Sequence, residues 1–372
     1  MTPTDPQAAG ARVAPEGDRA NHGTPAGSDA LAQSPFMRAC RRESVPYTPV
    51  WLMRQAGRYM GEYREVRART SFLELCKTPD LAAEVTVTAA ERLNVDAAII
   101  FADILLIIEP MGLELEFAKG EGPVIHNPVR DAGDVARVRE VEDPAALDYV
   151  YQAIRATRRA LRHDLPLIGF AGAPFTLASY ICEGGASKNY VHTKRLMYTD
   201  AGAWHALMSL IARALSGYLN AQLAAGAQAV QLFDSWVGCL SPADYREFVL
   251  PHTRAVIDAV TPGAPVLHFG TGTAALLELM REAGGDVIGV DWRVNLDEAW
   301  ERVGRDRAVM GNLDPVALFA GRDHVRREAR RILELAGNRD GHVFNLGHGI
   351  LPETPVENVV ALVEAVHEMS RR

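Results

Sequence analysis

The chain has 372 residues and a formal net charge of −8, which allows one large domain or two ordinary ones. The acidic balance argues against nonspecific binding to nucleic acid or to an anionic membrane surface. The four cysteines are scattered without a Cys-x-x-Cys pair, and no apolar run is long enough to span a bilayer. We therefore expect a cytoplasmic globular protein that contacts neither nucleic acid nor membrane.

Residues 1–33 differ in composition from the rest of the chain. They are rich in Ala, Gly, Pro, Asp, Thr and Ser and contain almost no large apolar side chains. Such a segment cannot bury enough apolar surface to offset the entropy lost on ordering it, which predicts a disordered N-terminal tail. The folded part is expected to begin at Ser34-Pro35-Phe36 and to form a single domain over 34–372.

Beyond the tail, short apolar runs alternate with longer stretches of helical spacing. The runs are mostly continuous, as expected for parallel strands buried on both faces, and they cover 50–53, 97–101, 167–170, 229–233, 266–269, 287–290, 308–310 and 343–346. Apolar residues at steps of three and four predict a helix over 203–223. Proline just inside a helix start follows Asp143, Ser241, Asp314 and Thr354.

Eight strand–helix alternations favour the α/β class and a (β/α)8 TIM barrel, with an open doubly wound sheet as the alternative. Neither nucleotide-binding glycine motif, Gly-x-Gly-x-x-Gly nor Gly-x-x-x-x-Gly-Lys-Ser/Thr, occurs where those folds need it.

In a (β/α)8 barrel the chemistry lies at the C-terminal ends of the strands. The polar residues that follow the runs are Arg54, Gln55, Asp103, Asp234, Ser235, His268, Asp291, Trp292, Asn312, Asp314, Asn345 and His348. Two connections, 104–144 and 171–200, are long enough to suggest functional loops.

The basic cluster Arg54-Gln55-Ala56-Gly57-Arg58 directly follows the first apolar run. A local positive site in an acidic protein favours a specific small anion over a polyanion held by bulk charge. Surface ion pairs are the plainer alternative for these arginines. That alternative is weakened for Arg54, because a guanidinium next to a buried strand needs a paired anion or carbonyl.

The remaining candidates each have a structural alternative. Asp103 suits a helix N-cap as well as a carboxylate that accepts ligand N–H groups. Tyr180 suits a packed aromatic ring, Ser235 a turn, and His348 a buried core histidine. His348 lies between two glycines, which permits close approach of the backbone to a ligand. No His-Glu-x-x-His motif or Gly-x-Ser-x-Gly elbow occurs, and no cysteine neighbours His268, so a metal site or serine nucleophile is not expected.

Several segments resemble one known family in order along the chain. Residues 49–58, Pro-Val-Trp-Leu-Met-Arg-Gln-Ala-Gly-Arg, resemble the N-terminal signature of the uroporphyrinogen decarboxylase family. Residues 169–177, with Tyr180 and Glu183-Gly184, are similar to its second signature. Shorter similar segments follow at 101–105, 232–236 and 345–349. The resemblance extends from about Phe36 to the C-terminus and leaves the tail uncovered.

The resemblance implies a (β/α)8 barrel, a homodimer whose two clefts face each other, and no metal or other cofactor. It implies decarboxylation of the four acetate side chains of uroporphyrinogen III to methyl groups, which gives coproporphyrinogen III. The implied substrate-binding residues are Arg54, Gln55, Ala56, Arg58, Asp103, Tyr180, Ser235 and His348, with Arg67 as a further basic position near the same mouth.

The implied chemistry suits these residue types. Arginine forks hold the carboxylates of the substrate, and Asp103 accepts its central pyrrole N–H groups and stabilises the cation that forms when a pyrrole carbon is protonated. Arg54 is the expected proton donor, through its placement or through a water, although its high pKa makes it a weak acid. Tyr180 and His348 are expected to bind carboxylates and to orient the reacting ring, which makes these four the expected catalytic residues.

Two alternatives stay open. A zinc- and cobamide-dependent methyltransferase of the same fold would bind zinc through a histidine and cysteines, and the zinc content of the protein distinguishes it. A non-catalytic tetrapyrrole-binding protein would keep the site without turnover, and incubation with uroporphyrinogen under reducing, anaerobic conditions distinguishes that alternative.

Overall fold

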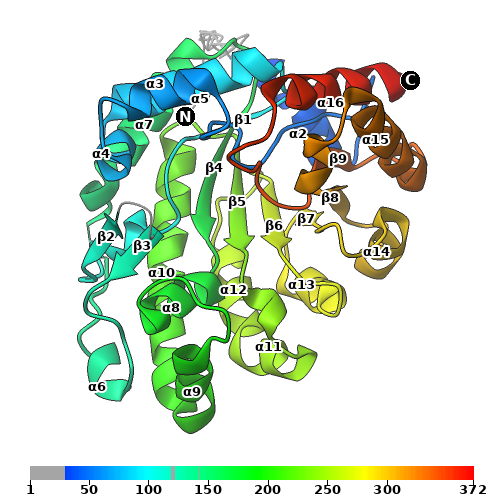
Figure 1. Ribbon diagram of the computed structural model, residues 1–372. Helices are drawn as coiled ribbons and strands as arrows, with labels where there is room; N and C mark the ends of the chain where they lie inside the picture. The colour runs from blue at the N-terminus through cyan, green and yellow to red at the C-terminus, as the bar shows by residue number, and fades with distance from the viewer. Residues whose placement is uncertain (1–29, 119–121, 142) are drawn as a thin grey trace, which may run out of the picture.

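The computed structural model describes residues 30–118, 122–141 and 143–372, and seven of its strands form one curled parallel sheet (Figure 1). In spatial order they are β1 (Ala98–Ile99), β4 (Leu167–Gly172), β5 (Ala229–Asp234), β6 (Val266–Gly270), β7 (Val287–Gly289), β8 (Ala308–Leu313) and β9 (His342–Leu346). All their residues except Phe233 are buried. Burial on both faces explains why the sequence shows continuous apolar runs rather than alternation.

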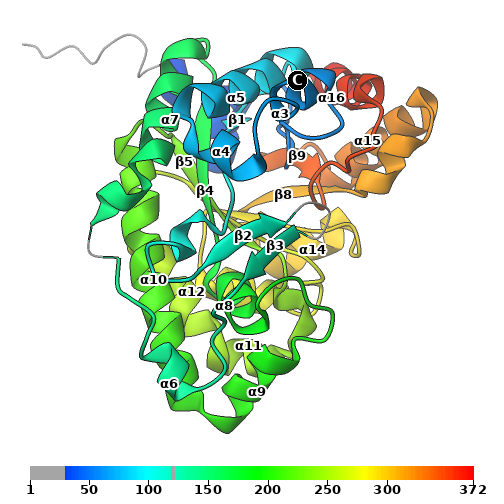
Figure 2. The same ribbon diagram turned by 60° about the vertical axis from the view of Figure 1, so that its left-hand side comes forward.

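A closed ring of helices covers the outside of this sheet (Figures 1 and 2). Each helix in the ring contacts the next, and α16 contacts α5 again: α5 (Pro79–Leu93), α7 (Asp148–Ala160), α10 (Ala201–Ala224), α12 (Leu250–Asp258), α13 (Leu277–Ala283), α14 (Leu296–Val303), α15 (Arg322–Ala336) and α16 (Val356–Met369). Together the two layers form a TIM-like α/β barrel. None of the helices in the described residues is both long and apolar enough to cross a membrane.

Residues 49–51 lie between β9 and β1, the last and first strands of the sheet. Phe344 N donates to Pro49 O at 2.8 Å, Trp51 N donates to Phe344 O at 3.3 Å, and Asp96 N donates to Val50 O at 2.8 Å. Within residues 50–53, all of which the structure describes, Val50 alone forms a β-bridge, with Phe344, so the prediction of a full strand over 50–53 is wrong in extent. The strand pattern ends because Met53 N donates to the Asn345 side chain at 3.2 Å instead of to a neighbouring backbone carbonyl.

The Asp96 carboxylate ties this segment to both ends of the folded chain. It accepts hydrogen bonds from Val50 N at 2.7 Å and Tyr47 Oη at 2.9 Å, and it lies 2.7 Å from Nε2 of His367 on α16. Asp96 is only 4% exposed, so each of these contacts is made away from water. The carboxylate therefore holds the residue-50 segment in the gap between β9 and β1.

The two long connections contain secondary structure that the sequence did not reveal. Residues 104–144 include the hairpin β2 (Leu115–Ala118) and β3 (Gly122–Ile125) and the short helix α6 (Ala132–Val135). Residues 171–200 include α8 (Pro174–Glu183) and α9 (Val191–Thr199), so the prediction of a loop there is wrong. Pro174 occupies the first turn of α8, where its missing N–H costs no hydrogen bond.

The hairpin stands beside the mouth of the barrel (Figure 2). Phe117 on β2 packs against Phe72 of α4 (Phe72–Lys77), with ring centroids 4.8 Å apart. At its other end, Ile125 N donates to Gly184 O at 2.9 Å, just beyond α8. The hairpin thus connects the basic N-terminal region to the Tyr180 helix.

The predicted helix start at Ser241 is confirmed, because Ser241 caps α11 (Pro242–Phe248) through a hydrogen bond from Asp244 N. Ser34, at the predicted start of the folded part, caps α2 (Pro35–Cys40). Asp143 and Asp314 cap the 3-10 helices Pro144–Leu147 and Pro315–Phe319 rather than α-helices. Residues 30–32 are helical, so the predicted disorder does not extend over 30–33, and its remainder lies outside the described residues.

We predict that Asp96→Ala destabilises the barrel by about 2–4 kcal/mol, because it leaves the buried Val50 N–H without an acceptor and breaks a three-partner network. Urea unfolding of the variant and the parent measures the difference. Asp164→Ala is the matched control, because Asp164 forms only a half-exposed pair with Arg162 at 3.0 Å. Equal losses in the two variants would contradict a special role for Asp96.

Candidate active site

Arg54 leaves the barrel wall in an unusual backbone conformation. Its φ is 60°, a left-handed value that non-glycine residues seldom adopt. Its side-chain stem lies against the glycine turn that follows β9: a Cβ added to Gly349 would lie 2.4 Å from Arg54 Cδ and 2.6 Å from Cγ. Glycine at 349 therefore provides the space in which the Arg54 stem lies.

The Arg54 side chain lies near Asp103 and Tyr180, and we call the part of the barrel mouth that these residues line the recess. Its side chain remains accessible to solvent, yet desolvation lowers the pKa of Arg54, so protein surrounds much of the group. The charges of Tyr180 and Asp103 act to raise this pKa, and the charge of Arg58 acts to lower it. These couplings bring together residues from three separate segments of the sequence.

Asp103 supplies the carboxylate of the recess, in the turn after β1. Leu105 N donates to Asp103 Oδ1 at 2.8 Å, which fixes this turn, but the N-cap of the following 3-10 helix is Leu105 rather than Asp103. Desolvation raises the pKa of Asp103 to about 6, although the Leu105 N–H and the Arg54 charge both act to lower it. The carboxylate keeps partial access to solvent, and so its free oxygen is able to accept a hydrogen bond from a ligand.

Tyr180 enters the recess from α8. Its ring stacks on Trp236 with centroids 3.8 Å apart and an interplanar angle of 27°. Burial and the charge of Asp103 raise the pKa of Tyr180 well above its usual value, so its hydroxyl stays protonated at neutral pH. Tyr180 is therefore a neutral hydrogen-bond donor held in a fixed orientation.

His348 lies in the turn between Gly347 and Gly349. Desolvation, and then the charges of Arg54 and Arg293, lower its pKa to about 4, while Asp291 acts in the opposite direction. The imidazole is therefore neutral at pH 7. Its Nδ1 accepts the Gly349 N–H at 2.7 Å, which leaves the proton on Nε2. Nε2–H is thus available to donate to a carboxylate without adding charge to the site.

The other predicted residues lie at different depths around this group. Ala56 and Ser235 are partly exposed, and Ser235 lies in the turn after β5. Arg58 is exposed, and its backbone O accepts a hydrogen bond from Arg64 at 2.9 Å. Gln55 is only 1% exposed, and its backbone O accepts the Tyr59 hydroxyl at 2.6 Å. Gln55 therefore shapes the loop, and its contact with a ligand remains a prediction.

Arg67 lies further out, at the end of α3 (Gly61–Arg67). It donates to Thr70 O, and its guanidinium lies 5.9 Å from the centroid of the Phe72 ring. The pKa of Cys76, which burial raises, also responds to the charges of Asp103 and Arg67, so both lie near this thiol. Arg67 therefore belongs to the rim of the recess on the side of α4.

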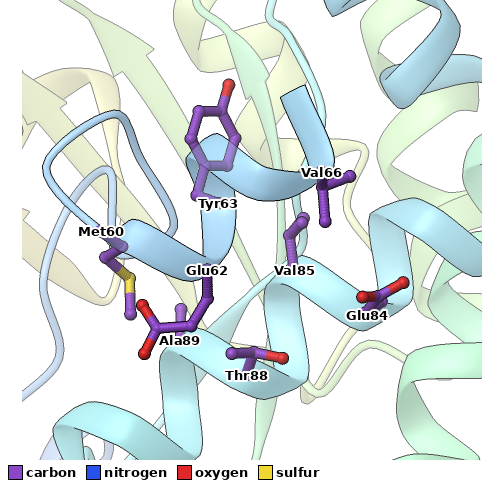
Figure 3. A pocket seen from close by; sticks show the side chains of 8 residues that line it. All are labelled: Met60, Glu62, Tyr63, Val66, Glu84, Val85, Thr88 and Ala89. Atoms are coloured by element: carbon purple, nitrogen blue, oxygen red, sulfur yellow. The ribbon is translucent and has the colours of Figure 1, made fainter. Parts of the chain in front are cut away.

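Two hollows in the described surface lie away from this group of residues. One of about 20 Å³ lies between α3 and α5 and has room for about one water (Figure 3). Another, of about 490 Å³, lies between α15 and the C-terminal end of α16, against the start of β9. None of the nine predicted residues lines either hollow. The described residues contain no group of three or more His, Cys, Asp or Glu arranged to hold a metal ion.

Two groups were not predicted as site residues. Trp236 supports the Tyr180 ring, and its position directly after Asp234-Ser235 at a strand end was the available signal. Arg293 follows Asp291-Trp292 beyond β7, and its charge reaches His348. A basic residue three positions past a predicted strand end is a weak signal by itself, so only the three-dimensional arrangement distinguishes it from surface arginines.

The fold and the site define a class of protein. This class is a TIM-like barrel enzyme whose mouth combines arginines, a desolvated carboxylate and neutral hydrogen-bond donors. The family model described as "Uroporphyrinogen decarboxylase (URO-D)" matches residues 31–369. The curated uroporphyrinogen decarboxylases of Carboxydothermus hydrogenoformans and Sorangium cellulosum are each 60% identical to this chain and cover 90% of it, and 96% of each relative is covered. The chain therefore belongs to the uroporphyrinogen decarboxylase family and is an enzyme of the carboxy-lyase class.

Solved structures show the same fold at lower identity. A methyltransferase from Methanosarcina mazei has a TM-score of 0.72 and 22% identity, covering 90% of this chain and 98% of that chain. A B12-independent methionine synthase from Shewanella has a TM-score of 0.53 and 12% identity, over 80% of this chain and 89% of that chain. At these identities the likeness concerns the fold alone.

We predict that Gly349→Ala lowers kcat/KM by about 100-fold, because the new methyl group occupies the space of the Arg54 stem and displaces its guanidinium. Steady-state decarboxylation assays measure the change, and thermal unfolding tests the fold in parallel. Gly321→Ala is the matched control, since no atom lies within 4 Å of the added Cβ. Full activity in Gly349→Ala would show that this packing does not position Arg54.

Proposed function

We propose that the chain removes the four acetate carboxylates of uroporphyrinogen III as CO₂ and leaves coproporphyrinogen III. The supporting observation is the desolvated Asp103 carboxylate next to the Arg54 guanidinium at the barrel mouth. The names of the curated relatives point to the same substrate. A substrate with a ring of carboxylates around central N–H donors requires cations for its carboxylates and an anionic acceptor for its N–H groups, and this recess has both.

In this proposal the cations bind the edge of the substrate and Asp103 binds its centre. Arg54 and Arg58 hold side-chain carboxylates through charge-assisted hydrogen bonds, and Arg67 extends this positive rim. Asp103 accepts pyrrole N–H bonds. Tyr180 and His348 donate to carboxylates as neutral groups, which orients the reacting ring without adding further positive charge. Gln55, Ala56 and Ser235 complete the binding surface.

Each decarboxylation consumes one proton and releases one CO₂. A proton added to the ring carbon adjacent to the one that bears the acetate makes the ring cationic, and the electron pair of the breaking C–C bond flows into the ring and forms an exocyclic methylene. The ring then loses that proton as the exocyclic carbon is protonated to a methyl group. Asp103, ionised and poorly solvated, stabilises the cationic ring. Arg54 is our proposed donor of the first proton, directly or through a water, because burial lowers its pKa.

We extend the proposal to the closure of the barrel, to the cellular location of the chain and to its oligomeric state. Residues 49–51 occupy the place of the eighth strand and close a (β/α)8 barrel, supported by their hydrogen bonds to Phe344 and Asp96. The chain acts as a cytoplasmic homodimer, supported by the family resemblance and by cysteines of which three are buried and none is paired within the described residues. Sedimentation at several concentrations tests the dimer.

The zinc-dependent alternative loses its expected ligand. His268 is fully buried, and its Nδ1 lies 3.2 Å from Gly284 O beside α13, on the outer side of the sheet rather than at the mouth. A non-catalytic binding protein would retain Arg54 and Asp103 equally well, so turnover must distinguish it from the enzyme.

Anaerobic incubation with uroporphyrinogen III under reducing conditions tests the function. We expect hepta-, hexa-, penta- and tetracarboxylate products in sequence, separable by chromatography after oxidation to porphyrins. Asp103→Asn keeps the shape of the side chain and is expected to lose about 100- to 1,000-fold in kcat. No products from the unmodified protein would refute the enzyme, and normal turnover by Asp103→Asn would refute the role of the carboxylate.

The proposal also predicts the acid limb of the pH profile. Asp103 must be ionised, and its pKa is raised to about 6, so kcat/KM should be constant above about pH 7 and fall tenfold per unit below about pH 6. Arg58→Gln is the control, with a higher KM and the same inflection. An inflection near 4, the ordinary range of an aspartate, would contradict the desolvated state of Asp103.

A further inference from the structure

Arg293 has an unusual partner for an accessible arginine. Its guanidinium forms an ion pair with Asp291 Oδ2, and the Asp291 side chain is completely buried while that of Arg293 is 48% exposed. Among the arginine–carboxylate pairs of the described residues, this is the one whose carboxylate has no exposure. Ordinary surface pairs expose both partners and contribute little. Because the Asp291 carboxylate is buried and cannot move freely, its ion pair holds the Arg293 guanidinium at a fixed place.

Two more contacts restrict the position of Arg293. The guanidinium carbon lies 4.0 Å from the centroid of the Trp292 ring, within the range of a cation–π contact. Asp291 is itself held, because it accepts the N–H of Gly272 at 2.6 Å and that of Arg293 at 3.3 Å. An arginine has five N–H donors, and pairing with one carboxylate and one ring leaves others directed to solvent.

Arg293 lies beside the His348 turn on a different side from Arg54. A Cβ added to Gly347 would lie 2.6 Å from Trp292 N, so the 347–349 turn packs directly on the 291–293 turn. The Arg54 stem packs on the same glycine turn at Gly349. The turn that carries His348 therefore packs on the 291–293 turn at Gly347 and on the Arg54 stem at Gly349.

We propose that Arg293 binds a propionate carboxylate of the tetrapyrrole at the rim of the site, beyond His348. This inference rests on the proposed function. The substrate has eight carboxylates, more than Arg54, Arg58 and Arg67 are able to hold, and the acetates disappear one after another during the reaction. The propionates persist through all four decarboxylations. A fixed cation at the rim therefore keeps the same carboxylate partner during the whole reaction only if that partner is a propionate. Arg293 contributes binding and orientation and takes no part in proton transfer.

Steady-state kinetics on the full-length enzyme test this assignment. We expect Arg293→Gln to raise KM for uroporphyrinogen III about tenfold with kcat changed less than about twofold, and to raise the inhibition constant of coproporphyrinogen III by a similar factor, since the product keeps its propionates. Arg293→Lys should lie between, because an ammonium keeps the charge and loses the fork. Arg305→Gln, at an arginine whose side chain is 77% exposed, is the matched control and should change neither constant.

The outcomes separate this inference from the function on which it rests. No turnover by the unmodified enzyme would refute the proposed function. Normal turnover by the unmodified enzyme with unchanged KM in Arg293→Gln would overturn the Arg293 assignment alone. A raised KM with an unchanged product inhibition constant would also overturn it, because the partner would then be an acetate. A loss confined to kcat would overturn it by showing that Arg293 only positions His348.

Discussion

The site depends on one electrostatic constraint: a carboxylate that is costly to ionise, Asp103, faces a guanidinium that is costly to bury, Arg54. Desolvation raises the pKa of the acid and lowers that of the base, and each charge partly offsets the cost of the other. The proposed substrate, with carboxylates outside and N–H groups inside, provides better partners for both. In the proposed function, the free energy gained by satisfying them is available for binding and for stabilising the cationic ring.

The fold is organised to bring these two residues together. Arg54 comes from the segment that spans β9 and β1, and Asp103 comes from the end of β1 itself. Asp96 fixes the first segment in place, and the glycine at 349 leaves room for the Arg54 stem. His348 and Tyr180 then line the recess as neutral donors, the first because arginines and burial lower its pKa, the second because burial raises its pKa. Positive charge is thus confined to the arginines.

The sequence predicted the elements whose physical signals are local. Continuous apolar runs marked the buried parallel strands, and Ser241 marked a helix start by its capping chemistry. The sequence did not predict that the β-bridge of this segment is confined to Val50. The reason is that Met53 N donates to the side chain of the distant Asn345 instead of to a backbone carbonyl. Likewise, the helices over 174–183 and 191–199 have only 10 and 9 residues, which is too short for the sequence to show a clear helical period.

For the site, the arginine cluster, Asp103, Tyr180 and His348 were all named from strand-end positions and family resemblance, and the structure brings these four regions to one recess. The burial of Gln55 and the anchoring of Arg293 were out of reach, because burial and pairing with a buried carboxylate are tertiary properties. The most direct test of the central claim is a titration of the Asp103 carboxyl group by infrared difference spectroscopy or by NMR with labelled aspartate, assigned with Asp103→Asn. The account predicts a pKa near 6 in the unmodified enzyme and a higher value in Arg54→Gln. A pKa near 4, or one that Arg54→Gln leaves unchanged, would contradict it.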